Sequence, residues 1–189
     1  MGLETAEIEA AVEAYPDRQP LAAVEREHLE LLPKAFADGD FGWRDAEWVV
    51  QWYYRRFLGA FPDDKRRARE DAYGENDHEA VQAAIDCAVE TDGAAAKLEH
   101  LTALSGVGVE VGSAFLQFIE PEAYLVVSHR EWGVLHAAGE LEAAYPDPPT
   151  GPEYERYLGT CETLLDRCDC DLVGVYRALW VLGADRDTD

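Results

Sequence analysis

Residues 101–116 carry the most informative pattern in this sequence, LTALSGVGVEVGSAFL. Two segments with apolar residues at helical spacing flank a short turn that contains Gly106 and Gly108. Glycine permits positive φ and a close approach of the backbone to a neighbour. A helix that begins after such a turn has free N–H groups whose dipoles favour an anion, for example a phosphate oxygen. The pattern predicts two helices joined by a tight turn that binds phosphate. The candidate phosphate-binding residues are Ser105, Gly106, Val107, Gly108, Val109 and Glu110.

Helical spacing of apolar residues continues through most of the chain, and no long stretch alternates with period two. We therefore expect an all-α fold of about eight to ten helices in a single domain over residues 1–189, either as one body or as two lobes. The two helices and the glycine turn between them are placed at residues 94–120. Two C-terminal helices within residues 153–182 follow a proline-rich linker, 146–152. The first helix is expected to end before Tyr15, because the residue preceding a proline disfavours the helical conformation.

Composition excludes several classes of protein. The 189 residues are 48% apolar and 11% aromatic, which is too rich in core-forming residues for a disordered chain. No run of 18 apolar residues is present, and residues 1–15 are acidic where a signal peptide would be basic and then apolar. These features predict a cytoplasmic protein with no membrane partner. Four cysteines are too few and too clustered for a secreted disulfide framework, so we expect reduced thiols.

The charge balance is strongly acidic. Asp and Glu number 39 against 16 Lys and Arg, for a formal net charge of -23. Such a charge destabilises a compact state by self-repulsion unless salt screens it. We expect a halophilic, archaeon-like source with a salt-rich cytoplasm. The alternative is an acidic protein that binds a basic partner or mimics nucleic acid.

Two local clusters stand out against this background. Six of the 16 basic residues fall within residues 55–69, either as a solvated helix face or as a surface that faces phosphate. The candidate DNA contacts among them are Arg55, Arg56, Arg66 and Arg67. The second cluster is the aromatic stripe of residues 48–58, which at helical spacing predicts core rather than exposed rings for base stacking.

The turn and its continuation, residues 118–132 (FIEPEAYLVVSHREW), resemble the helix-hairpin-helix DNA glycosylase superfamily. Residues 98–135 carry the specific part of the resemblance. Members of that superfamily grip a DNA backbone phosphate through hairpin amides, so the resemblance implies a DNA-binding protein of the repair type. Phosphate contacts position a protein without reading bases, so no sequence specificity is implied. Ser128, His129 and Arg130 are then candidate pocket or DNA contacts.

Two departures from the family pattern bear on activity. The lysine that attacks the sugar in bifunctional members is replaced by Glu110, and the aspartate that stabilises the sugar cation is replaced by Ser128. We therefore expect DNA binding without base excision. One alternative is an active monofunctional glycosylase that uses Glu131 or Glu120. Another is an acidic protein-interaction module in which the glycine turn is only structural.

No metal site or cofactor is expected. The five histidines show no paired ligand spacing. Cys161, Cys168 and Cys170 match the first spacing of the family's iron-sulfur loop, but the next gap is a single residue and no fourth cysteine follows.

Overall fold

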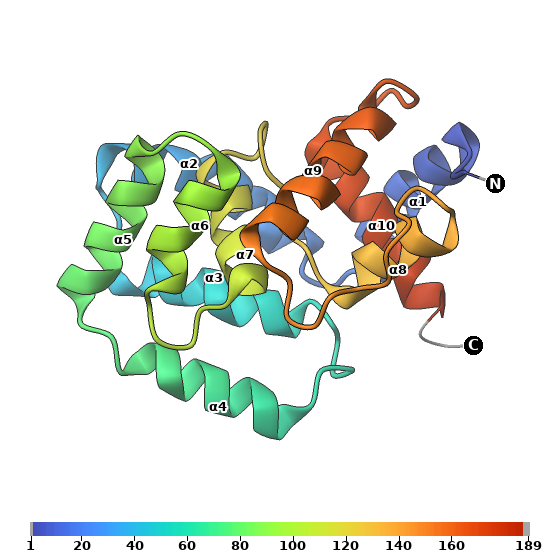
Figure 1. Ribbon diagram of the computed structural model, residues 1–189. Helices are drawn as coiled ribbons and strands as arrows, with labels where there is room; N and C mark the ends of the chain where they lie inside the picture. Colours follow the sequence, from blue (N-terminus) through green and yellow to red (C-terminus); the bar gives the residue numbers. More distant parts are fainter. Residues whose placement is uncertain (1, 187–189) are drawn as a thin grey trace.

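The computed structural model describes residues 2–186, and within that range it holds ten helices and no strand (Figure 1). The all-α class and the predicted number of helices are therefore confirmed. The helices are α1 (Thr5–Arg18), α2 (Ala22–Asp38), α3 (Trp43–Arg55), α4 (Asp63–Gly74), α5 (His78–Glu90), α6 (Ala94–Thr102), α7 (Val109–Ile119), α8 (His129–Ala137), α9 (Gly151–Leu165) and α10 (Leu172–Arg186).

Helix α7 lies at the centre of the fold. Every residue from 111 to 119 is buried, and α2, α3 and α6 pack against it. Gly112 permits the close contact with α6, because a Cβ there would lie 2.8 Å from Leu98 Cδ2. Helix α1 packs along α10, and α10 also contacts α8 and α9. Helix α4 lies at the outer edge of the molecule, beside α3 (Figure 1).

The end of α1 differs from the sequence prediction. The helix continues through Tyr15 and Pro16 to Arg18, and Gln19 N donates to Tyr15 O at 2.9 Å. Proline so near a helix end removes only one backbone hydrogen bond. The Tyr15 ring is fully buried against Trp180, at a centroid distance of 5.5 Å. Tertiary packing thus outweighs the local preference of the residue before proline.

The aromatic stripe is core, as predicted, except at its end. Val49, Trp52, Tyr53 and Phe57 are each at most 2% exposed. Leu58, in contrast, is 50% exposed and has a left-handed backbone with φ 53°. The chain leaves α3 before this residue and turns toward α4, so helical spacing no longer determines which side chains face inward.

The proline-rich segment 146–152 packs against the body of the protein. Just before it, Ala143 O accepts a hydrogen bond from Trp132 Nε1 at 2.9 Å, and Tyr145 contacts the Trp132 ring. Pro149 is buried. Helix α9 begins at Gly151, two residues earlier than predicted, with a capping box formed by Thr150 and Glu153.

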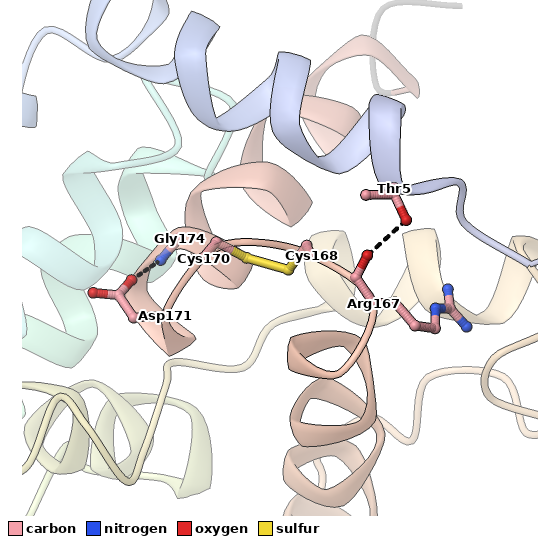
Figure 2. Close-up of a disulfide and its surroundings, with 6 residues drawn as sticks. All are labelled: Thr5, Arg167, Cys168, Cys170, Asp171 and Gly174. Carbon is pink, nitrogen blue, oxygen red and sulfur yellow. Dashed lines mark hydrogen bonds between the residues drawn. A yellow bond between two sulfur atoms is a disulfide. The ribbon is translucent and has the colours of Figure 1, made fainter.

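The cysteines also depart from the expectation of reduced thiols. Cys168 and Cys170 form a disulfide in the loop between α9 and α10 (Figure 2). Their Cα atoms are 5.5 Å apart, a normal separation for a bridged pair, which the cysteine count alone does not reveal. The same loop is tied to α1, because Thr5 Oγ1 donates to Arg167 O at 2.6 Å. Cys161 is buried and Cys87 exposed, and both are free thiols. Between residues 2 and 186, no helix is both long and apolar enough to cross a bilayer.

Candidate nucleic-acid interface

The turn between α6 and α7 (residues 103–108) is anchored to α4. Gly106 has φ 77°, and a Cβ on it would lie 2.6 Å from both Arg69 O and Tyr73 N. Only glycine fits this contact between two backbones. Just beyond α4, Asn76 exchanges two hydrogen bonds with Ser105: Ser105 N donates to Asn76 Oδ1 at 2.9 Å, and Asn76 Nδ2 donates to Ser105 O at 3.0 Å. The turn is therefore rigidly held.

The six candidate phosphate-binding residues are not equivalent. The N–H of Ser105 is used by Asn76, and the N–H of Val107 donates to Leu104 O at 3.2 Å. In contrast, the N–H groups of Gly108, Val109 and Glu110 find no acceptor among residues 2–186. Gly108 is exposed, while Val109 and Glu110 are half-buried. The first turn of α7 thus keeps free donors at its N-terminus.

Glu110 belongs to this turn, but its carboxylate does not accept from these donors. Glu110 Oε1 instead accepts a short hydrogen bond from the Tyr145 hydroxyl. Burial and the adjacent Glu110 carboxylate raise the pKa of Tyr145, which keeps the hydroxyl protonated as the donor. The negative charge is therefore directed toward Tyr145 rather than over the free N–H groups.

A hollow of about 850 Å³ lies beside the first turn of α7, where Glu110 lines it, and we call it the first hollow. Helices α3, α4, α7 and α8 all contribute to its wall, together with residues 57–62 and the proline-rich segment. It is lined by Tyr53, Tyr54, Phe57, Ala60, Phe61, Pro62, Lys65, Ala68, Arg69, Glu110, His129, Arg130, Tyr145 and Asp147. Five of these residues are aromatic rings of Tyr or Phe.

The charge of this lining is opposite to that of the chain. Three cationic residues, Lys65, Arg69 and Arg130, face two acidic ones, Glu110 and Asp147. Over the whole sequence, acidic residues outnumber basic ones by 39 to 16. Lys65 and Arg69 are exposed, and neither forms an ion pair within the part of the chain that the structure describes. The hollow is therefore a local cationic site on an acidic protein.

Of the three candidate contacts at residues 128–130, His129 and Arg130 line the first hollow, whereas Ser128 lies in the interior. His129 is exposed and lines the hollow, with its ring stacked on Phe57 at 5.6 Å. Arg130 also lines it but is only 5% exposed, because its guanidinium lies over the rings of Phe57 and Trp180. Ser128 is fully buried and caps α8, accepting from Arg130 N at 3.1 Å. Ser128 is thus a structural residue rather than a surface contact.

Arg56 is a correction to the set of predicted DNA contacts. Its side chain is fully buried, and Arg56 Nη1 lies 2.5 Å from Glu131 Oε1. Ser128 Oγ donates to the other Glu131 oxygen at 2.5 Å, and the Arg56 guanidinium carbon lies 4.6 Å from the Phe57 ring centroid. Because Phe57 lines the first hollow, the buried Arg56–Glu131 pair packs on the inner side of its wall. A basic residue in a basic run can face inward, since helical phase decides its direction.

Glu131 and Glu120, the carboxylates that an active glycosylase would use, both form ion pairs outside the first hollow. Burial alone would raise the pKa of Glu131, but the charge and hydrogen bonds of Arg56, with the Ser128 hydroxyl, outweigh burial and hold this pKa below its ordinary value. Glu120 forms an ion pair with Lys97 at 3.0 Å. Neither residue lines the first hollow.

The remaining predicted contacts are Arg55, the last residue of α3, and two arginines of α4. Arg55 and Arg67 are exposed, whereas Arg66 is half-buried and pairs with Asp63 and Glu70. Sequence reasoning missed Lys65 and Arg69 as individual site residues, although both belong to the basic cluster it singled out. It also missed Tyr145, because the aperiodic sequence around the proline-rich linker gives no signal that this residue contacts the first turn of α7.

Comparison with known proteins adds no assignment: no protein-family model, curated protein or solved structure matches this chain. Among the described residues, no group of three or more His, Cys, Asp or Glu side chains is placed to hold a metal ion.

Proposed function

We propose that this protein binds DNA without sequence specificity, through the first hollow and the adjacent N-terminus of α7, and that it does not excise bases. The observation that carries the proposal is the reversal of charge at the hollow, where cationic residues outnumber acidic ones in a chain of net charge -23. A cationic site beside free backbone N–H groups is suited to a phosphate backbone. The resemblance to the helix-hairpin-helix glycosylase superfamily supports the same ligand.

The aromatic walls suit a nucleobase that has left the helical stack. A volume of about 850 Å³ falls within the range of small-molecule sites, and the half-buried rings of Phe61 and Tyr145 keep part of their surface accessible to a base. Leu58 follows Phe57, which lines the hollow, and has its side chain half exposed and its backbone in the left-handed region. Strained residues cluster at functional sites, and exposed apolar side chains act as wedges between base steps. We assign Leu58 this role in distorted or damaged DNA.

The absence of base excision is proposed from the two replaced positions. Glu110 stands where a lysine nucleophile would be, and Ser128 is buried in a hydrogen-bond network instead of presenting a carboxylate. Glu131 and Glu120 are held in ion pairs. The protein is thus proposed to recognise DNA, with a salt-rich cytoplasm of a halophilic source as its working environment.

A salt-dependent binding titration tests the proposal. Fluorescence anisotropy is measured with undamaged, abasic and mismatched duplexes in 0.1 to 1 M KCl. Phosphate contacts by the two exposed cations of the hollow, Lys65 and Arg69, predict a slope of log K against log salt of about -2, so that affinity falls only about 60-fold to 100-fold over this range. Distorted duplexes should bind more tightly than undamaged ones, and no free base should be released. Failure to bind any duplex, in salt that keeps the protein folded, would reject the proposal in favour of an interaction module.

A further inference from the structure

A second hollow adjoins the first. It has a volume of about 360 Å³ and is lined by Tyr54, Arg55, Gly59, Phe61, Asp63 and Arg66. Tyr54 and Phe61 line both hollows, so the two recesses meet along these rings. The proposed function uses only the first hollow.

Phe61 is held in place at the boundary. Its ring centroid lies 4.9 Å from that of Tyr54 and 5.7 Å from that of Phe57. Tyr54 and Phe57 are buried, whereas Phe61 is half-buried and keeps part of its ring accessible. The boundary between the two hollows is therefore a fixed aromatic ring.

The charges of the second hollow favour an anion. Arg66 is shared between Asp63, at 3.2 Å, and Glu70, at 3.0 Å, and is largely neutralised. Arg55 is exposed and forms no ion pair with any residue from 2 to 186. Taken together, the two hollows present five cationic residues against three acidic ones.

We infer that the two hollows hold two successive nucleotides of an unpaired DNA strand, with the phosphate of the second nucleotide on Arg55. This inference rests on the proposed function and names its substrate class. In a duplex, neighbouring bases stack directly on each other. A fixed ring between two recesses separates the two bases, and each then contacts an aromatic side chain instead of its neighbour. The site therefore requires a strand that is single or locally melted.

Competition binding tests this inference. Thymidine monophosphate, the dinucleotide pTpT, a 15-residue oligo(dT) and a 15-base-pair duplex compete against labelled oligo(dT). We expect pTpT to compete at least tenfold better than the mononucleotide, and oligo(dT) better than the duplex. Arg55→Glu should remove the advantage of pTpT. Arg67→Glu is the matched control, because Arg67 is an equally exposed arginine of the basic cluster that lines neither hollow.

The outcomes separate the two proposals. If the duplex binds as tightly as oligo(dT), and Arg55→Glu behaves as Arg67→Glu does, the inference is overturned while the proposed function stands. Equal competition by pTpT and the mononucleotide would likewise overturn it. If none of the four ligands competes and the labelled strand itself does not bind, both proposals fail. Circular dichroism of each variant verifies that it is folded.

Discussion

Tyr145 and Glu110 form a hydrogen bond that joins the residue just before the proline-rich segment to the first turn of α7. The two residues are 35 positions apart in the chain, and both line the first hollow. This contact explains how a carboxylate can occupy the N-terminal turn of a helix that is proposed to face phosphate. The carboxylate is held by a phenol, and the N–H groups of Gly108 and Val109 remain free.

Removing the charge of Glu110 should strengthen DNA binding. A unit charge a few ångströms from a phosphate costs about 1 kcal/mol in water, which corresponds to roughly fivefold in affinity. Glu110→Gln keeps an acceptor for Tyr145 and should bind duplex DNA about fivefold more tightly in 0.1 M KCl, measured by anisotropy. Glu122→Gln, an exposed carboxylate outside both hollows, should have no effect. Weaker binding by Glu110→Gln would mean that the carboxylate itself contacts the ligand.

The buried pair Arg56–Glu131 should control stability in a pH-dependent way. Glu131→Gln leaves the Arg56 charge unpaired, and breaking a buried pair costs about 3 to 5 kcal/mol. Because the pKa of Glu131 is lowered in the folded state, its stabilising contribution is complete above the ordinary carboxyl value of 4.5 and is lost as pH falls through the folded-state pKa. Urea unfolding should therefore show a large difference between wild type and variant at pH 7 that shrinks toward pH 3.

A double variant provides the control for that prediction. Arg56→Met with Glu131→Leu removes both charges, and it should recover most of the stability that either single substitution loses. A difference between wild type and Glu131→Gln that stays constant with pH would contradict an ionised Glu131 in the folded protein.

Leu58 offers a way to separate stability from binding. Asparagine tolerates the left-handed conformation better than leucine, so Leu58→Asn should leave the free energy of unfolding unchanged or raise it by up to about 1 kcal/mol. The same variant loses the exposed apolar side chain and should bind abasic and mismatched duplexes several-fold more weakly. Undamaged duplex serves as the control, since it needs no wedge. If Leu58→Asn bound each of the three duplexes as tightly as wild type does, Leu58 would not be part of the binding site.

Salt should stabilise the fold. The formal net charge of -23 repels itself, and the Debye length falls from about 10 Å at 0.1 M salt to about 3 Å at 1 M. Thermal unfolding followed by circular dichroism should give a melting temperature that rises steadily with KCl. A melting temperature that is flat between dilute buffer and molar KCl would end the halophilic interpretation.

The helices followed from the sequence because apolar residues recur at helical spacing. The glycine turn joins α6 to α7 inside the region 94–120 where two helices and a turn were expected. The site was only partly predictable, because it is assembled from segments that meet only in three dimensions. The direction of Arg56 depends on helical phase at the end of α3, and the packing of Tyr145 depends on a segment without periodicity. The contact between Gly106 and the α4 backbone likewise forms only in the tertiary structure.

A charge reversal on α4 tests whether the first hollow is where DNA binds. Lys65→Glu with Arg69→Glu changes two exposed cations that line the hollow, and Arg67→Glu changes an exposed cation of the same helix that does not. Anisotropy titrations of an abasic duplex in a KCl series should show at least a tenfold loss of affinity for the double variant. Its salt slope should flatten by about 2, whereas Arg67→Glu should stay within about threefold of wild type. Equal losses in the two variants, or no loss in either, would show that the first hollow is not the binding site.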